Sequence, residues 1–223
     1  MSRYTGSKSK VSRRFGEPIF GREKEIKRPN PPGQHGAKRK RKVSEYGQQL
    51  LEKQKAKYIY GMREGQFRIF FERAMAKKGK TGDLLLQMCE SRLDNVVYRL
   101  GIAPTRAAAR QLVTHKHIVV DGKVLNIPSY IVKAGQTVGV REKDRQMIAI
   151  TSSLEHRPVS GSWLTWDATT MTGTFVQVPE RAEIPENINE QALSGNGNTV
   201  RDRLICYLSI GLIVKIQNSS ELL

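Results

Sequence analysis

Residues 91–123 constrain the fold more than any other part of the chain, because their pattern predicts two short helices followed by a tight hairpin. Ser91 and Asp94 have the Ser-x-x-Asp spacing that starts a helix, and apolar residues then recur at helical spacing until a glycine. Asp121 and Gly122 stand between two runs rich in β-branched residues, which is the strongest local signal for a hairpin with a two-residue turn. The segment therefore predicts a small unit that mixes helices and strands.

The second helix of this unit, which follows Pro104, is predicted to carry positive charge on one side. Arg106 and Arg110 are four residues apart and so share a face, whereas Ala108 and Leu112 point largely toward a core. Guanidinium groups bind phosphates through paired hydrogen bonds, so this face suits a folded polyanion. A solvated, charged helix surface of the ordinary kind is the open alternative.

The composition independently favours a polyanionic partner. Lys and Arg number 38 against 21 Asp and Glu in 223 residues, which gives a formal net charge of +17. Such an excess indicates nucleic acid or an anionic surface as the partner. Aromatic residues make up only 7% of the chain. This content argues against a stacking platform for single-stranded bases and favours recognition of structured RNA through its shape and backbone.

The first 42 residues hold much of this charge and too little apolar material for a core of their own. They contain 14 Lys or Arg against three Glu, interrupted by glycines and prolines. A disordered basic tail is one interpretation. We prefer an arm that becomes ordered against RNA, because its cations can replace counterions on the phosphate backbone. The start of the chain is not apolar, so we do not expect a secretory signal there.

Residues 43–79 are predicted to be helical and to bury an apolar stripe with three-four spacing. The stripe consists of Phe67, Phe70, Phe71 and Ala74. Asp83 is predicted to cap the next helix, over residues 84–90. Beyond the hairpin, residues 131–140 predict a further strand pair and residues 147–150 another strand.

Motifs spread along the chain resemble those of a known family. The motifs of the central segment are Arg92-Leu93-Asp94, Thr105-Arg106, Ala109-Arg110-Gln111-Leu112, Val120-Asp121-Gly122 and Pro128-Ser129-Tyr130. In this order they resemble the S4 RNA-binding module. The turn Pro31-Pro32-Gly33-Gln34-His35-Gly36, with Arg3-Tyr4, Ser44-Glu45-Tyr46-Gly47 and Gly173-Thr174-Phe175, resembles the bacterial form of the family of small ribosomal subunit protein four.

The resemblance implies an α+β fold, in which a mostly helical domain carries an inserted small mixed α/β module of S4 type and an extended basic N-terminal arm. The implied boundaries are an arm over residues 1–42, the helical domain over 43–90 and again over 156–192, the module over 91–155, and an atypical tail over 193–223.

The implied function is that of a structural constituent of the small ribosomal subunit, which binds and organises small-subunit ribosomal RNA early in assembly. Neighbouring small-subunit ribosomal proteins and messenger RNA are the implied further partners, and the family implies roles in decoding accuracy and at the messenger entry path. We expect a cytoplasmic location on the ribosome and no membrane contact. The predicted RNA-binding residues are Arg3, Arg13, Arg14, Lys38, Arg39, Lys40, Arg41, Lys42, Arg92, Asp94, Thr105, Arg106, Arg110, Gln111, His115, Lys116, Asp121, Gly122 and Lys123.

The alternative is an RNA-modifying enzyme or a heat-shock-type RNA binder that uses the same module. Arg92-Leu93-Asp94 superficially matches the acidic signature of RNA pseudouridine synthases, but roughly seventy residues after the module are too few for the sheet domain of such an enzyme. The four histidines have no metal-ligand spacing, and no phosphate-binding glycine loop is present. Cys89 and Cys206 form no paired motif, which indicates free thiols. We expect no catalytic residue, no metal and no cofactor.

The family pattern ends after Ala192. An apolar run of about thirteen residues, 204–216, follows a turn-rich stretch and is shorter than the roughly twenty residues that span a bilayer. We hypothesise that residues 193–223 are a divergent or frame-shifted ending that leaves part of the helical domain poorly covered. The resemblance implies a short amphipathic helix that begins at Asn189-Glu190-Gln191 and ends the chain. The alternative is that the apolar run folds back and substitutes for this helix.

Overall fold

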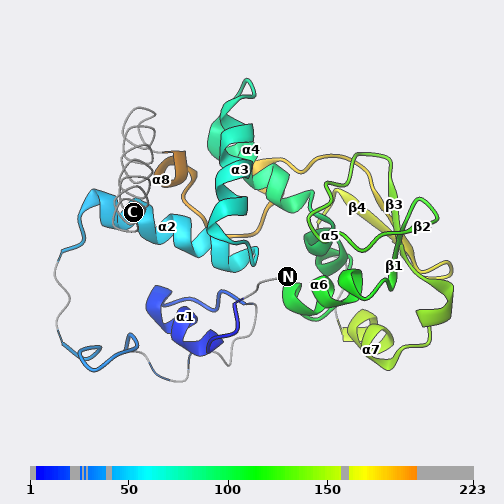
Figure 1. The fold of residues 1–223 in the computed structure, drawn as a ribbon, viewed down its shortest axis with the longest axis horizontal. Helices are drawn as coiled ribbons and strands as arrows, with labels where there is room; N and C mark the ends of the chain where they lie inside the picture. Colours follow the sequence, from blue (N-terminus) through cyan, green and yellow to red (C-terminus); the bar gives the residue numbers. More distant parts are fainter. Residues whose placement is uncertain are drawn as a thin grey trace, which may run out of the picture.

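The computed structural model describes residues 4–20, 26, 28, 30–38, 42–156 and 161–194. Within them, a helical half and a half that mixes helices with a sheet lie next to each other along the long axis of the molecule (Figure 1). Each half has a hydrophobic core of its own. The predicted α+β class, with a small mixed module attached to a helical domain, is confirmed.

The helical half is built from α2 (Glu45–Ile59), α3 (Glu64–Met75), α4 (Thr81–Glu90) and the short α8 (Glu190–Ser194). The predicted aromatic stripe is buried on α3, where it packs with the apolar side chains of α4. Asp83 is not the N-cap of α4, because this helix begins at Thr81 and Asp83 lies in its first turn. A carboxylate at that position still interacts favourably with the helix dipole.

Cys89 lies in this core as a free thiol, and burial raises its pKa to about 12. Its Sγ lies 3.8 Å from Sδ of Met62. The other cysteine lies outside the described residues.

The N-terminal region folds onto the helical half. Helix α1 (Lys8–Phe15) ends at Gly16, whose left-handed backbone, at a φ of 76°, suits a glycine. Val11 and Ile19 are buried in the core of the helical half, and Lys55 pairs with Glu17 at 2.7 Å. Residues 8–20 therefore form a docked segment, and the prediction of an extended arm is wrong for this part of the chain.

The module begins with α5 (Leu93–Arg99) and α6 (Arg106–Thr114). The predicted helix-start box is wrong, because Arg92 is the N-cap of α5 and the Ser91 hydroxyl donates backward to O of Gln87 at 2.8 Å. On α6 the deepest side chains are Ala109 and Val113. The predicted Ala108 and Leu112 pack against the core less deeply.

The predicted hairpin is confirmed. Strand β1 (Ile118–Val120) pairs with β2 (Lys123–Val124) in a register that sets Val120 opposite Lys123. The two turn residues have positive φ, 48° at Asp121 and 77° at Gly122, as expected of a type I′ turn.

The sheet has five strands in the order β2-β1-β3-β5-β4, and every neighbouring pair is antiparallel. Its last two strands, β4 (Leu164–Asp167) and β5 (Thr172–Phe175), come from the stretch 156–192 that the sequence analysis gave to the helical domain. They pair with β3 (Thr137–Val140), so this part of the stretch belongs to the sheet. A Cβ on Gly173 would lie 2.5 Å from a methyl of Leu100, so a glycine there lets α5 and the loop after it approach the sheet.

Two strand predictions are wrong. Residues 147–150 lead into α7 (Ile148–His156), where Ile150 and Ser153 are buried at helical spacing and the Ser153 hydroxyl donates to O of Gly101 at 2.7 Å. Residues 131–140 give one strand instead of two, since Ile131 forms only an isolated bridge with Arg92. Short 3-10 turns, η2 (Glu142–Asp144) and η3 (Arg181–Glu183), complete the fold.

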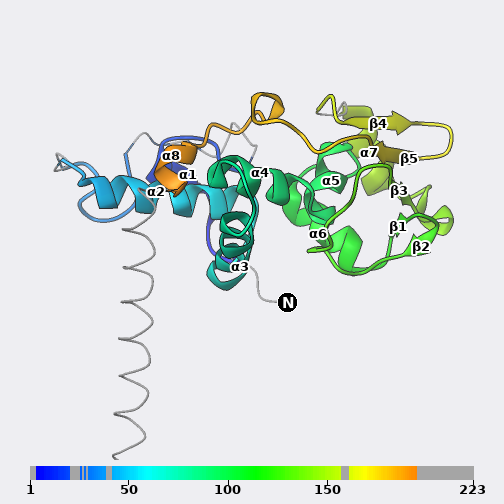
Figure 2. The same ribbon diagram turned by 90° about the horizontal axis from the view of Figure 1, so that it is seen from above.

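The segment after β5 runs back across the junction of the two halves to α8 (Figure 2). Its residues Ile184, Ile188 and Leu193 are buried in the core of the helical half. The predicted short helix after Asn189 is confirmed as α8, and it includes the first two residues of the predicted tail, 193–223. Both hypotheses about this tail otherwise concern residues beyond 194, outside the described part. No helix in the described part is long and apolar enough to cross a bilayer.

Candidate nucleic-acid interface

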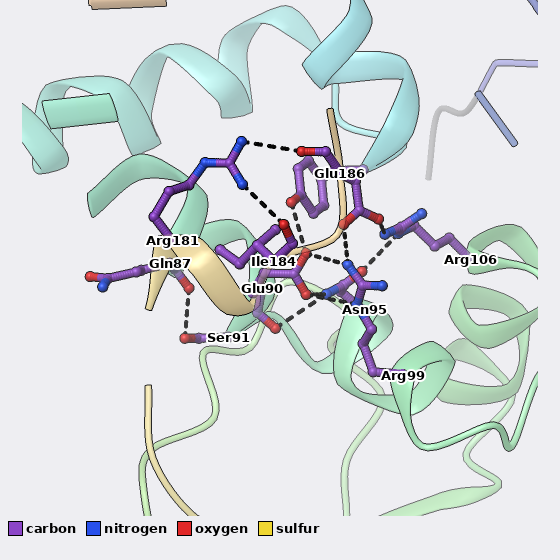
Figure 3. Close-up of polar contacts among 10 residues, drawn as sticks. Gln87, Glu90, Ser91, Asn95, Arg99, Arg106, Arg181, Ile184 and Glu186 are labelled. Carbon is purple, nitrogen blue, oxygen red and sulfur yellow. Dashed lines mark hydrogen bonds and ion pairs between the residues drawn. The ribbon is translucent and has the colours of Figure 1, made fainter. Parts of the chain in front are cut away.

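A network of buried charges joins the two halves (Figure 3). Glu90, at the end of α4, is fully buried and accepts hydrogen bonds from Arg99 of α5, with 3.0 Å to Nε and 2.7 Å to Nη2. The hydroxyl of Tyr60 donates to the same carboxylate at 2.8 Å. The charge of Glu90 is thus neutralised by an arginine from the other half, and its remaining lone pairs are satisfied by hydrogen bonds.

Glu186, on the returning segment, extends the network to α6. One of its carboxylate oxygens is paired with Arg99 and the other with Arg106. Burial by itself would raise the pKa of Glu186, but the guanidinium groups of Arg106 and Arg99 outweigh it and hold the pKa below its ordinary value. For Arg99, burial acts to lower the pKa, yet the hydrogen bonds and charge of Glu90 raise it overall. Both shifts favour the charged forms of Glu186 and Arg99 at neutral pH.

Arg106 is accordingly not displayed on an open surface. Its side chain is 14% exposed, and Nε donates to Oδ1 of Asn95 at 2.7 Å. The guanidinium carbon lies 4.5 Å from the ring centroid of Tyr98 and 5.2 Å from that of Tyr60, which adds cation–π attraction. This arginine joins α6 to the rest of the protein, whereas the sequence predicted that it contacts a phosphate of the RNA.

Other predicted site residues also have partners inside the protein. Arg92 is buried and pairs with Asp94 through Nε at 3.1 Å and Nη2 at 2.8 Å, so the aspartate orients an arginine. Thr105 caps α6, because its hydroxyl accepts the N–H of Ala108 at 3.2 Å. Arg13 donates to the carbonyl oxygens of Asn30, at 2.8 Å, and Pro31, at 3.2 Å, and so fastens the glycine-rich turn to α1.

The glycine-rich turn forms as the sequence predicts. The N–H of Gly36 donates to O of Gly33 at 3.1 Å. A Cβ on Gly36 would lie 2.1 Å from O of Pro31, so only a glycine fits.

The hairpin residues are likewise used within the sheet. The carboxylate of Asp121 accepts hydrogen bonds from N of Thr137 at 2.9 Å and Nε2 of Gln136 at 2.7 Å. The bond from the Thr137 backbone is the main reason why the pKa of Asp121 lies below its usual range. Gly122 supplies the left-handed turn conformation.

The remaining predicted residues are on the surface. Exposed side chains are those of Arg14, Lys38, Lys42, Gln111, His115, Lys116 and Lys123. Arg110 is half-buried and donates from Nη1 to O of Gly61 at 2.9 Å, and burial lowers its pKa, although a guanidinium stays protonated. The predictions for Arg3, Arg39, Lys40 and Arg41 fall outside the described residues.

The structure gathers part of this surface into a groove of about 390 Å³ between α1, the end of α2 and α6. The predicted residues that line it are Asp94, Arg106, Arg110, Gln111 and His115. The groove is also lined by four residues that were not predicted to belong to a site, namely Tyr4, Lys8, Phe20 and Tyr58. Lys8 and Phe20 lie in the first 42 residues, which were interpreted only through their charge. No local sequence pattern there indicates that these side chains line a groove.

A second depression, of about 470 Å³, lies beside the hairpin. Lys116 and Arg141 line it together with Val124 and Asn126. Arg141 was not among the predicted RNA-binding residues. The positive charge of Lys116 is thus joined by that of Arg141 beside the hairpin.

Comparisons with known proteins agree with this architecture. Residues 3–90 match the model of the ribosomal protein S4/S9 N-terminal domain, and residues 91–138 match that of the S4 domain. A small ribosomal subunit protein uS4 from Parabacteroides distasonis is 60% identical over 195 residues, covering 86% of this chain and 97% of that protein. The uS4 proteins of Bacteroides thetaiotaomicron and Porphyromonas gingivalis are 60% and 57% identical with the same coverage.

The chain belongs to the uS4 family of small ribosomal subunit proteins. The family resemblance inferred from the sequence motifs is thereby confirmed, including the S4 module. The boundary between the two family models, at residues 90 and 91, falls between α4 and α5. Glu90 and Arg99 therefore join one matched domain to the other.

Proposed function

We propose that the chain is a structural constituent of the small ribosomal subunit, which binds and organises small-subunit ribosomal RNA early in assembly. Membership of the uS4 family supports the location on the ribosome, and the net charge of +17 supports an RNA partner. The observation that carries the proposal is the fixed arrangement of α1 and α6. Both line one groove, and the buried network around Glu90 and Glu186 holds α6 against the helical half.

In this mechanism the protein presents a preformed surface to the RNA. The cations of α1, the glycine-rich turn, the end of α6 and the hairpin contact phosphates, while the rigid junction fixes the distances between those contacts. A folded RNA junction that matches these distances is stabilised over its alternatives, because a ligand favours the conformation that it binds. Shape and backbone contacts of this kind suit structured RNA.

The finer roles implied by the family belong to the same proposal. Neighbouring ribosomal proteins and messenger RNA would contact surfaces that the ribosomal RNA leaves open, and the effect on decoding accuracy would follow from that position. We also propose that the chain has no catalytic activity of its own. The buried ion pair between Asp94 and Arg92 supports this, since both carboxylate oxygens already accept hydrogen bonds from the guanidinium group and are not free to act as a nucleophile.

Salt titrations of RNA binding test where the phosphate contacts lie. Replacement of Lys10, Arg14 and Lys38 by glutamine should weaken binding to small-subunit ribosomal RNA of Parabacteroides distasonis. It should also flatten the slope of log affinity against log salt, by about 0.9 for each phosphate of a double-stranded region that the variant no longer neutralises. The control replaces Arg73, Lys77 and Lys78, which are exposed at the end of α3 and in the loop after it.

Equal slopes for the two triple variants would contradict the assignment of phosphate contacts to α1 and the turn. Equal affinity of the parent chain for small-subunit and large-subunit ribosomal RNA would contradict the proposed function itself.

An assay for pseudouridine formation tests the proposal that the chain has no catalytic activity. Purified chain incubated with a transcript of the same ribosomal RNA should leave every uridine unchanged when pseudouridines are mapped along the transcript. A single pseudouridine that disappears when Asp94→Asn protein is used would show that the chain is an enzyme.

A further inference from the structure

The groove between α1, α2 and α6 has an aromatic side. The rings of Tyr4 and Tyr58 meet edge to face, with centroids 5.4 Å apart and planes at 79°. Phe15 supports Tyr58 from α1 at 6.1 Å. The tyrosine on α2 is thus held in a fixed orientation at the groove. Rings held in this way provide a surface on which a nucleobase stacks with little loss of side-chain entropy.

Other residues that line the groove are polar or positively charged. Gln111 is exposed on α6 and His115 directly after it, and Arg110 is fixed on α6 by its bond to O of Gly61. Lys8 projects from α1, with its ammonium 5.7 Å from the ring centroid of Phe20. Asp94 is the one acidic side chain among the described residues that line the groove, and Arg92 already neutralises it. The groove therefore combines net positive charge with a primary amide that can pair with the edge of a base.

A base, a sugar and a phosphate together match this combination. The volume of about 390 Å³ is within the range of small-ligand sites. A base inside a duplex is stacked on both faces and cannot enter, whereas an unpaired base in a loop or bulge can leave the stack and rest on an aromatic side chain.

We propose that this groove binds one unpaired nucleotide of the RNA, with its base against Tyr58, its edge at Gln111 and its phosphate near Lys8 and Arg110. The inference rests on the proposed function. It adds base stacking on an aromatic side chain, which the low aromatic content of the chain argued against. Four of the thirteen Tyr and Phe residues of the chain line this one groove, so their placement matters more than their number.

A fluorescent bulge tests the proposal. The probes are an RNA hairpin with a single bulged 2-aminopurine, the same hairpin with an abasic bulge, and a fully paired version. Stacking on tyrosine should quench the 2-aminopurine, and the chain should bind the bulged base about tenfold more tightly than the abasic site. Tyr58→Phe should keep both effects, because it retains the ring, whereas Tyr58→Leu should lose both.

Two further variants separate a local effect from misfolding. Gln111→Ala changes an exposed side chain and should reduce the difference between the bulged and abasic hairpins while leaving affinity for the paired hairpin unchanged. Tyr46→Leu, at the start of α2 and away from the groove, should behave as the parent chain.

Equal affinity for the bulged and abasic hairpins, with no quenching, would overturn the nucleotide site while leaving the proposed function intact. A chain that binds these hairpins but shows no preference for small-subunit ribosomal RNA would instead overturn the proposed function.

Discussion

Glu186 neutralises two arginines of the module from a segment that returns to the helical half. Its partners, Arg99 and Arg106, precede it by 87 and 80 residues. No local pattern in a sequence indicates a pair at such separations, so the helix pattern predicted a phosphate contact for Arg106 and no role for Glu186. The burial of Arg92 and Asp94 was not predicted for a related reason, since the sequence alone does not show that this pair is enclosed by the fold.

Replacement of Glu186 tests the strength of the junction. Glu186→Gln leaves two largely buried guanidinium groups without this anion, and we expect a loss of about 3 kcal/mol in the free energy of unfolding at pH 7. Urea denaturation followed by circular dichroism measures it, with Glu142→Gln on the exposed η2 turn as the control. A loss no larger than that of the control would show that the network contributes no net stability.

Acid should remove the contribution of Glu186. Its pKa is lowered in the folded state, so the stabilisation is complete above the ordinary pKa of 4.5 and is lost as the pH falls through the lowered folded value. The difference in unfolding free energy between the parent chain and Glu186→Gln should therefore shrink from pH 7 toward pH 3. A difference that stays constant over this range would mean that Glu186 is not charged in the folded protein.

Among the elements, those specified by neighbouring residues could be predicted and those specified by distant ones could not. The turn at Asp121 and Gly122 was predicted because two adjacent residues determine its backbone. The helices of the helical half were predicted from an apolar period that they carry themselves. The pairing of β5 with β3 depends on a contact between distant segments, and the four apolar residues 147–150 are too few to distinguish a strand from the start of α7.

In the candidate site too, features that depend on neighbouring residues could be predicted and those that depend on distant residues could not. Exposure of Gln111, His115, Lys116 and Lys123 agrees with the predicted helix face and hairpin. The groove could not be predicted, because it exists only where the docked α1 faces α6.

The hairpin offers a test at the level of one turn. Gly122→Ala places a Cβ at a φ of 77°, which should cost about 1 kcal/mol of unfolding free energy. Gly65→Ala is the matched control, because Gly65 lies inside α3 with open space around it, and there alanine should stabilise by up to about 1 kcal/mol. Thermal denaturation of both variants gives the comparison, and the same sign of change in both would contradict the turn assignment.

Across the whole molecule, the two cores are joined by buried ion pairs and by the segment that crosses from β5 to α8. We therefore expect the two halves to unfold together, in one calorimetric transition, because neither half keeps its charges satisfied without the other. Glu186→Gln should broaden or split that transition. Two well-separated transitions in the parent chain would show that the junction does not couple the halves.

The crossing segment also sets an order of events during synthesis. A chain made from its N-terminus exposes α2, α3 and α4 long before Ile184 and Ile188 emerge to complete their core, and β3 waits similarly for β5. Neither half can reach its final packing until residues near 190 have left the exit tunnel. Folding of this protein therefore waits for the synthesis of the crossing segment, and RNA that arrives earlier meets an incomplete surface.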